Sequence, residues 1–420
     1  MMRVLVVGAG LGGLCLSHSL QRMGAEVSVF DRDASPWARP QGYRLHLDAD
    51  AVAAIYAAVP DQLYRLFEAT TMVPEPYTTI VDTSLAVQRR FISDGPAEPA
   101  GRPDRPILHA NVNRATLREI LLTGLDDVIQ WDEKLVHFDS DDHGVTATFA
   151  SGRTERGDLL VGADGIHSAV RRLRLPQLQL QDTGVRAIYG RIPMSTAVDA
   201  LPAQVLGDVF TVAVDDRKVF FGLGPVAFPV APDTASQQIY PAAGLRPQGD
   251  YVVSIVGGRS QFFGHDDTTL RGLSSSDLQS VAGQVISGWP EAMNRLPSLG
   301  DPTSFFIVEM FTSIPAPFGH PLNVTVLGDA VHAMTPTLGR GANIAMRDAR
   351  ILAQQLKPVL DKNAHLSDAL RAYEDDMTSY AFKVVRDSAA MGTRLMGQQP
   401  LPSSPVAALQ QSHTAPEPSA

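Results

Sequence analysis

Short apolar runs and longer, helically spaced ones alternate at the start of the chain. The run RVLVV at 3–7 is rich in valine and is followed by glycine, which is typical of a buried parallel strand. Leucines then recur at helical spacing from 11 to 20, Gly24 ends this pattern, and EVSVF at 26–30 is a second strand. The pattern therefore predicts a strand–helix–strand unit within about 30 residues.

The next part of the chain mixes helical and strand-like patterns. A helix is predicted at 113–125, with Asn113 as its N-cap. A hairpin at 134–152 and an apolar strand at 157–162 follow it. Helix and strand thus continue to alternate, as they do in the first unit.

From about residue 183 the sequence pattern changes from alternating helices and strands to strands. Residues 183–315 contain several strand-like runs, with a turn at Asp215 and Asp216, which indicates a mostly antiparallel sheet. A buried strand and two helices, at about 341–357 and 366–396, complete the pattern.

We therefore predict an α/β fold: a Rossmann-type dinucleotide-binding domain, an interleaved and mostly antiparallel β-sheet substrate domain, and C-terminal helices. The last residues are rich in Pro, Ser and Gln, which is typical of a disordered tail. The predicted boundaries are 1–71, 107–182 and 316–397 for the three parts of the dinucleotide-binding domain (the last with the helices), 72–106 for an excursion into the substrate domain, 183–315 for the substrate domain itself, and 398–420 for the tail.

Composition restricts the class of protein. The formal net charge of −10 over 420 residues leaves no basic surplus to neutralise phosphates, which argues against nucleic-acid binding. Cys15 is the only cysteine, so no disulfide framework or thiolate metal site can form within one chain. The first strand leaves no room for a leader, and no apolar run approaches the roughly 18 residues of a membrane span. We expect a soluble cytoplasmic protein, either a monomer or a homodimer.

A glycine-rich loop separates the first strand from the first helix. Gly8, Gly10 and Gly13 fit the pattern G-x-G-x-x-G. Glycine lets the backbone approach a pyrophosphate closely, and the N-terminus of the helix attracts its negative charge. Asp31, directly after the second strand, can accept hydrogen bonds from ribose hydroxyls. A dinucleotide site is therefore predicted here, and the loop alone does not distinguish a flavin from a nicotinamide.

Two further turns that pair glycine with aspartate lie at the carboxyl ends of apolar strands, where open α/β sheets bind ligands. The first contains Asp164 and Gly165 in VGADGIHSAVR, and the second contains Gly328 and Asp329 in GDAVHAMTPTLGRGAN. The end of the second motif leads directly into a helix, whose first N–H groups can bind a negatively charged group. Reduced flavin carries such charge around N1 and its C2 carbonyl, so this motif favours a flavin.

With these three motifs in this order, the chain resembles the group A flavoprotein monooxygenases, the para-hydroxybenzoate hydroxylase-like family, from Met2 to about residue 395. In that family the first motif holds the ADP part of FAD, the Asp-Gly motif contributes to FAD and NAD(P)H binding, and the Gly-Asp motif holds the ribityl chain. The resemblance implies that resident FAD is bound by Gly8, Gly10, Leu11, Gly12, Gly13, Asp31, Arg32, Arg44, Arg114, Asp164, Gly165, Gly328, Asp329, Pro336, Gly339, Gly341, Ala342 and Asn343.

The resemblance also implies roles for single residues. Asp31 binds the adenosine ribose, Arg32 lies along the adenine, and Arg114 reaches the ribityl–phosphate region. Backbone N–H groups at 341–343 face the isoalloxazine. Two positions depart from the family pattern: Asp31 replaces a more usual glutamate, and Arg340 stands where glutamine is common, which bears on what approaches the flavin.

The implied activity is that of an FAD-dependent monooxygenase. NADPH or NADH visits the enzyme and reduces a mobile flavin, and O2 then forms a C4a-hydroperoxide whose distal oxygen is transferred. The expected substrate is an aromatic or polycyclic, polyketide-like small molecule that is hydroxylated. Baeyer–Villiger oxidation, epoxidation, a flavin-dependent reductase and a non-catalytic flavin-binding protein are the alternatives.

Substrate-side residues are expected on the segment QGYRLHL, which by resemblance runs beside the isoalloxazine. Strand alternation puts Arg44 and His46 on one face and Tyr43 on the other. Arg44 and His46 are the candidates for the catalytic centre. For His46 we favour a hydrogen-bonded structural role, with a base that polarises the substrate as the alternative. The eleven histidines are scattered, without the spacing of metal ligands, so no metal site is predicted.

Overall fold

The computed structural model describes residues 1–38, 42–93, 95, 98–319 and 323–402. One of its two large sheets is five-stranded and parallel, in the order β19-β13-β1-β2-β9. Near-continuous apolar strands suit this sheet because helices and a small antiparallel sheet pack against it and bury its strands. Its strands are β1 (Arg3–Val7), β2 (Glu26–Phe30), β9 (Ile129–Gln130), β13 (Leu159–Gly162) and β19 (Val324–Val326).

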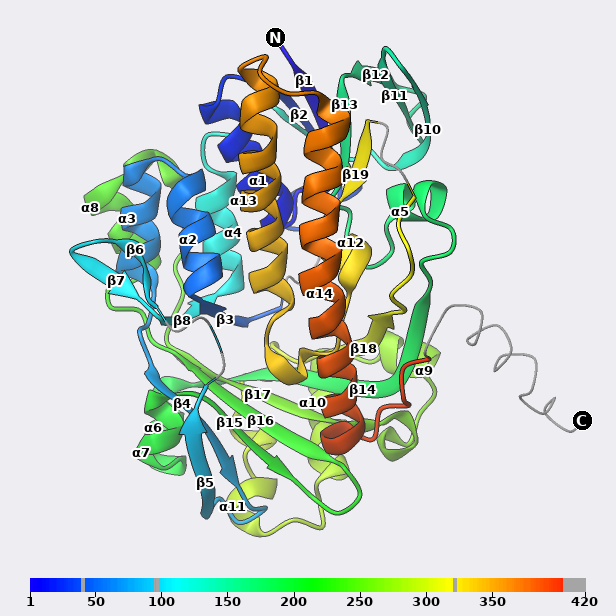
Figure 1. Ribbon diagram of the computed structural model, residues 1–420. Helices are drawn as coiled ribbons and strands as arrows, with labels where there is room; N and C mark the ends of the chain where they lie inside the picture. The colour runs from blue at the N-terminus through cyan, green and yellow to red at the C-terminus, as the bar shows by residue number, and fades with distance from the viewer. Residues whose placement is uncertain (39–41, 94, 96–97, 320–322, 403–420) are drawn as a thin grey trace, which may run out of the picture.

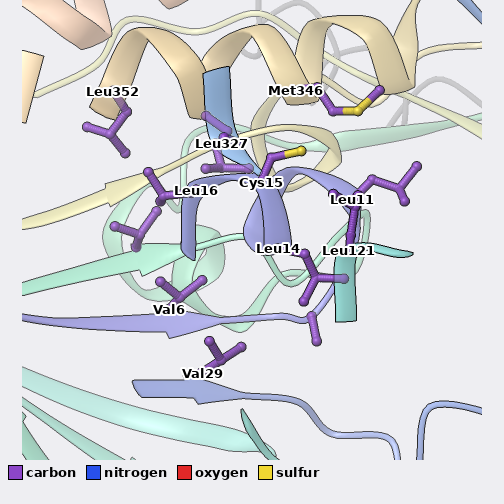
Figure 2. Packing of buried hydrophobic residues seen from close by; sticks show 14 of the residues in the cluster. Val6, Leu11, Leu14, Cys15, Leu16, Val29, Leu121, Leu327, Met346 and Leu352 are labelled. Atoms are coloured by element: carbon purple, nitrogen blue, oxygen red, sulfur yellow. The ribbon is translucent and has the colours of Figure 1, made fainter. Parts of the chain in front are cut away.

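Two long helices pack together over this sheet, α1 (Leu11–Arg22) and α13 (Gly341–Leu360). The leucines of α1 are buried in the main hydrophobic core. Figure 2 shows Cys15 among these apolar side chains, where it is 1% exposed. Burial raises the pKa of its thiol to about 12. The cysteine is therefore an inert packing residue.

Further helices surround the same domain (Figure 1). The cap predicted for the fourth helix is confirmed, because the Asn113 side chain accepts a hydrogen bond from the Thr116 N–H. The helices are α2 (Ala49–Ala58), α3 (Asp61–Thr70), α4 (Arg114–Leu122), α5 (Ala169–Arg174), α12 (Asp329–His332) and α14 (Leu366–Met396), and a small antiparallel sheet contains β10 (Leu135–Asp141), β11 (Gly144–Phe149) and β12 (Thr154–Gly157).

The second large sheet has seven strands in the order β18-β14-β17-β16-β15-β4-β5. All its pairings are antiparallel except that of β15 with β4. The mixed α/β fold predicted from the sequence is confirmed. The strands are β4 (Glu75–Val81), β5 (Val87–Ile92), β14 (Leu180–Pro193), β15 (Asp208–Val214), β16 (Phe220–Val226), β17 (Tyr251–Arg259) and β18 (Phe306–Ser313).

The two faces of the seven-stranded sheet differ. Short helices and their apolar side chains cover one face and form a second core. The other face is turned toward the dinucleotide-binding domain, and the N-terminal end of α13 points at it (Figure 1). The remaining helices are α6 (Met194–Ala200), α7 (Ala203–Gly207), α8 (Pro232–Ile239), α9 (Asp267–Gly272), α10 (Ser275–Val285) and α11 (Glu291–Asn294).

A two-stranded antiparallel ribbon of β3 (Arg44–Asp48) and β8 (His109–Asn113) joins the domains. Both of its strands contact β16 of the seven-stranded sheet, and β3 also contacts α13. Polar side chains of the ribbon face this sheet. The Asn111 amide donates a hydrogen bond to the Pro225 carbonyl, and the Asn113 amide donates one to the Tyr251 hydroxyl. A second short hairpin, β6 (Ala100–Arg102) and β7 (Arg105–Ile107), packs near α2.

The end of the chain departs from the predicted tail. Gln398 is only 2% exposed, and its Oε1 accepts a hydrogen bond from Thr335 Oγ1 at 3.0 Å. Gly392 makes this possible, because a Cβ there would lie 2.2 Å from that same Oε1. The first residue of the predicted tail is thus packed, and the rest of it from 403 onward lies outside the described residues.

Candidate cofactor and active site

The glycine-rich loop packs tightly on the second motif. Gly8 has a φ of +111°, and a Cβ there would lie 2.2 Å from the Ala163 carbonyl oxygen. A Cβ on Gly13 would lie 2.2 Å from the Gly8 oxygen, so a side chain is excluded at both positions. Gly10 is the N-cap of α1 and has no side chain to cap it. The first N–H groups of α1 are therefore available to an anion.

Asp31 shapes this loop as well as marking the end of β2. Its Oδ2 accepts from the Ala9 N–H at 2.7 Å and its Oδ1 from the Asp33 N–H at 2.9 Å. The side chain is 6% exposed. A carboxylate has about four lone-pair positions, so acceptor capacity for a ribose hydroxyl remains. The neighbouring Arg32, predicted to lie along the adenine, is exposed.

Arg118 is a loop-supporting residue that sequence reasoning missed. It is 3% exposed, and its Nε donates to the Ala9 carbonyl at 3.1 Å. Its Nη1 donates to the Pro36 carbonyl at 2.5 Å. The signal in the sequence is the spacing, because Arg118 lies one helical turn after Arg114 on α4.

The Asp-Gly motif lies between β13 and α5. Asp164 Oδ2 accepts from the Ala169 N–H at 2.6 Å, while its Oδ1 is buried without a hydrogen-bond partner among the described residues. Burial raises the pKa of this carboxyl. Gly165 follows with a φ of +74° and open space where its Cβ would lie. The unsatisfied oxygen fits a ligand that donates a hydrogen bond.

The Gly-Asp motif presents a carboxylate beside the N-terminus of α13. Asp329 is exposed, and it accepts no hydrogen bond from another described residue. Its Oδ1 lies 3.8 Å from the point where a Cβ of Gly341 would lie. Gly328 adopts a left-handed φ of +64°, and the resulting turn points the Asp329 carboxylate outward. The start and the end of the third motif are thus adjacent in space, which suits the hydroxyls of a ribityl chain.

A buried ion pair supports this turn from below. Asp348 Oδ2 accepts both from the Gly328 N–H, at 3.0 Å, and from His332 Nε2, at 2.6 Å. Both side chains are 0% exposed. Burial lowers the pKa of His332, but the Asp348 carboxylate outweighs it and raises the pKa overall. Asp348 was not identified from the sequence, where its only signal is its place on α13, below the cofactor turn.

The loop before α13 is fixed by Asn343 and Arg340. Gly339 has a left-handed φ of +63°, and it follows Pro336 in a short 3-10 turn. Asn343 Nδ2 donates to the carbonyls of Gly339, at 2.8 Å, and His46, at 3.0 Å. The side chain of Asn343 therefore ties the loop to β3, and the backbone N–H groups of Gly341, Ala342 and Asn343 are in the first turn of α13.

Arg340, the departure from the family pattern, points at carboxylates on α2 and its cap. Its Nε lies 3.2 Å from Asp48 Oδ2, and its Nη2 lies 3.9 Å from Asp50 Oδ2. It also donates to the Tyr380 hydroxyl. The arginine therefore anchors the loop through its ion pairs.

The two residues expected at the catalytic centre lie on the ribbon, on the same face, as strand alternation predicts. Arg44 reaches toward the seven-stranded sheet: its Nη2 donates to Asn111 Oδ1 of β8 at 2.5 Å and to the Val209 carbonyl of β15. Burial lowers the pKa of Arg44 to about 9. A Cβ on Gly224 would lie 2.6 Å from Arg44 Cδ, so this glycine makes room for the arginine.

His46 lies closer to the loop at 336–340 before α13, which we call the cofactor loop. Its Nδ1 is 4.0 Å from the point where a Cβ of Gly339 would lie, and its Nε2 is 3.0 Å from His109 Nδ1. His109 was not singled out from the sequence. Arg114, the predicted ribityl–phosphate contact, opens α4, and its N–H donates to the Tyr43 carbonyl at 2.7 Å. Its guanidinium lies 3.6 Å from the Cβ position of Gly42.

A cationic hollow of about 560 Å³ lies beside the second motif. His167, Arg171 and Arg172 line it. Arg171 Nη1 donates to the Ile166 carbonyl, at 2.7 Å, and to the Ala330 carbonyl, at 3.2 Å, so it joins the second motif to the third. Burial lowers the pKa of His167, and the positive charges of Arg32, Arg171 and Arg172 lower it further.

The described part of the chain also bears on metal binding and on membrane insertion. Within it, no group of three or more His, Cys, Asp or Glu side chains could hold a metal ion. None of the helices there is both long enough and apolar enough to cross a membrane.

Comparison with known families and proteins agrees with this geometry. Residues 6–69 match the NAD(P)-binding Rossmann-like domain, and residues 277–388 match the FAD binding domain. The chain is 31% identical over 424 residues to a dual O-methyltransferase/FAD-dependent monooxygenase, CTB3, of Cercospora beticola (95% of this chain, 47% of the relative). It is 28% identical over 407 residues to the chloroplastic zeaxanthin epoxidase of Oryza sativa subsp. japonica (93% of this chain, 55% of the relative). The chain thus spans about half the length of these relatives.

A solved structure of similar size shares the whole fold. It is that of a candidate FAD-containing monooxygenase from Photorhabdus luminescens subsp. laumondii, with a TM-score of 0.76 and 26% identity, covering 93% of this chain and 98% of the other. The resemblance inferred from the three motifs is therefore confirmed: the chain is homologous to FAD-dependent monooxygenases and carries the FAD-binding and Rossmann-like domains of that group.

Proposed function

We propose that this protein is an FAD-dependent monooxygenase that uses NADPH or NADH and O2 to insert one oxygen atom into an aromatic or polycyclic small molecule, by hydroxylation. The observation that carries the proposal is the exposed Asp329 carboxylate beside Gly341, at the start of α13. Bound FAD would supply the electron transfer and the activation of O2.

In this proposal the residues of the chain bind the cofactor, orient the substrate and exclude water. The N-terminus of α1 neutralises the pyrophosphate, and Asp164 and Asp329 accept hydrogen bonds from cofactor hydroxyls. The N–H groups at the start of α13 stabilise negative charge on the cofactor ring. Asn343 and Arg340 hold this helix end against β3, so that the ribbon and the ring keep a fixed separation.

The cationic hollow supports the use of a nicotinamide cofactor. Among its side chains, Arg171 and Arg172 offer the charge that phosphate groups require. Arg32 adds to this charge, because it is close enough to lower the pKa of His167. A nicotinamide cofactor bound there would lie next to the second motif without needing a domain of its own.

The face of the seven-stranded sheet turned toward α13 supports a flat, apolar substrate. Its half-buried side chains include Phe210, Tyr189 and Phe306. The last two rings stack, with centroids 5.5 Å apart and planes 16° from parallel. The Phe210 ring lies over Gly222, where a Cβ would be 2.6 Å from its Cζ. This face thus presents aromatic rings, one of them over a glycine, and such a surface favours planar aromatic molecules.

The first experiment replaces Asp329 by alanine and measures the flavin absorbance of the purified protein. Loss of a charge-assisted hydrogen bond should weaken FAD binding by about 10- to 100-fold. Asp139→Ala is the matched control, because the Asp139 side chain is 82% exposed on the distant β10. Equal flavin content in the two variants would contradict the placement of the cofactor.

The second experiment follows anaerobic reduction of the bound flavin by NADPH and by NADH across a panel of phenols and polycyclic aromatics. A ligand that accelerates reduction, and that gains one oxygen atom when air is admitted, supports the proposal. Epoxidation is a second candidate because of the similarity to zeaxanthin epoxidase, and an epoxide formed from an isoprenoid alkene would favour it. A saturated product formed without O2 would instead indicate a reductase.

A further inference from the structure

Two histidines of the ribbon bond directly to each other. In the register of β3 and β8, His46 pairs with Asn111 and Asp48 pairs with His109, so the two imidazoles are diagonal neighbours on one face. His46 Nε2 lies 3.0 Å from His109 Nδ1, and the rings are tilted by 34° with centroids 5.1 Å apart. At this distance one of the two nitrogens donates and the other accepts.

The outer nitrogen of His46 faces the cofactor loop. His46 Nδ1 lies 4.0 Å from the Cβ position of Gly339, and it forms no hydrogen bond with another described residue. The side chain is half-buried, unlike that of His109, which is 3% exposed. Asn343 holds the backbone of His46 through its carbonyl. The ring is therefore fixed in place with one nitrogen available on the cofactor side.

The charges around the pair keep both rings neutral. Burial lowers the pKa of His46 well below its usual value, and Arg44, His109 and Arg340 lower it further. Burial also lowers the pKa of His109. The nearby carboxylate of Asp48 is committed to Arg340 and to the N-cap of α2. A neutral pair has one shared N–H between its facing nitrogens, and so can pass a proton along.

We propose that His46 and His109 form a proton relay, in which His46 Nδ1 accepts the proton of a substrate hydroxyl and His109 carries it onward. The inference rests on the proposed function, and it adds His109 to the candidate base identified from the sequence, His46. His46 is the catalytic base, and His109 acts through it.

The steps conserve protons and electrons. The substrate O–H bond breaks, its proton goes to His46 Nδ1, and the oxygen keeps the electron pair as a phenolate. The proton on His46 Nε2 passes to His109 Nδ1, and the proton on His109 Nε2 passes to water. Nothing is oxidised or reduced in this step. The phenolate ring is more electron-rich than the phenol, and is held by the new Nδ1–H of His46.

The test uses the FAD-loaded, oxidised protein and alizarin, a planar phenol whose colour changes on ionisation. Stopped-flow absorbance gives the rate at which bound alizarin ionises. His46→Gln keeps a group at the Nε2 position but has no proton acceptor at Nδ1, so the rate should fall by about 10²-fold. His137→Gln is the matched control, because the His137 side chain is 56% exposed on β10 and remote from the ribbon.

Two variants of His109 separate a relay from a merely positioning role. His109→Asn keeps a hydrogen-bonding atom at the Nδ1 position but cannot pass a proton on, and His109→Leu removes both properties. A relay predicts that both variants lose about as much rate as His46→Gln. Ionisation at the wild-type rate in His109→Asn, with loss only in His109→Leu, would overturn the relay. So would a wild-type rate in His46→Gln.

A second measurement does not depend on the substrate. Nitrogen-15 NMR of the FAD-loaded protein should show both imidazoles neutral at neutral pH, with one proton shared between His46 Nε2 and His109 Nδ1. His109→Leu should then change the tautomer of His46. Independent behaviour of the two rings would overturn the relay. If alizarin does not bind while FAD does, the polycyclic substrate class fails and the NMR result alone decides the relay.

Discussion

Replacing Asp348 by asparagine tests how far the buried pair with His332 supports the cofactor turn. At 2.6 Å, two opposite charges in a medium of effective dielectric about 20 attract each other by about 6 kcal/mol. Desolvation of both groups opposes this, and removing one partner of a buried pair typically costs about 3–5 kcal/mol. Asparagine can still accept one hydrogen bond, so we expect Asp348→Asn to lose about 3 kcal/mol of unfolding free energy.

The loss should depend on pH with a definite sign. The folded-state pKa of His332 is raised, so its contribution is full below the unfolded-state pKa of about 6.5 and is lost as pH rises through the higher folded-state value. The stability of the wild type should therefore fall over this window. In Asp348→Asn this fall should be absent, and the two proteins should differ less at alkaline pH.

Urea unfolding followed by tryptophan fluorescence, at about pH 6 and about pH 9, measures both effects. Asp387→Asn is the matched control: its pair with Lys383 has a similar length of 2.7 Å, but the two side chains are 51% and 77% exposed. That variant should lose less than about 1 kcal/mol. If Asp348→Asn unfolds at the same urea concentration as this control, or keeps the wild-type pH dependence, the reasoning is refuted.

Further predictions concern two glycines, one ion pair and the buried cysteine. A Cβ on Gly13 would lie 2.2 Å from a backbone oxygen of the same loop, so Gly13→Ala should lower FAD content by at least about tenfold, whereas Gly283→Ala, in open space on α10, should stabilise the fold by about 0.5–1 kcal/mol in a urea titration. Burial raises the pKa of Asp48 and Arg340 lowers it, so Arg340→Gln should raise this pKa further; the stability of the variant should then fall more steeply than that of the wild type as pH rises from about 4, and identical profiles would contradict this. Cys15 should react with a thiol reagent only on unfolding, and a fast reaction in the folded protein would argue against its burial.

The sequence predicted what is local and missed what is assembled from distant segments. The glycine loop, the two Asp turns and the helix cap at Asn113 depend on neighbours in the chain, and they could be inferred from spacing alone. That His46 meets His109 depends on the register of two strands 63 residues apart, which no local pattern shows. Arg118 and Asp348 went unnoticed because a charged residue on a helix is ordinarily at the surface.

The direction of Arg44 illustrates the same limit. Strand alternation correctly predicted the face of the ribbon on which Arg44 lies. It does not say whether the side chain extends toward the cofactor loop or toward the seven-stranded sheet. Gly224, on a strand 180 residues later, has no side chain and leaves the space that the Arg44 stem occupies. The absence of a Cβ at one distant position thus decides where a long side chain goes, and only the assembled structure contains that information.

The packing of Gln398 links the end of the chain to the cofactor loop mechanically. Thr335 immediately precedes the turn that leads to Gly339, and it is bonded to Gln398 and, through its carbonyl, to Ser388 of α14. Tension applied to the chain beyond 402 would therefore reach the cofactor loop through a side-chain hydrogen bond before it unravelled α14. A rigid attachment at this end would strain the loop that we propose to hold the flavin ring, whereas a slack one would leave that loop undisturbed.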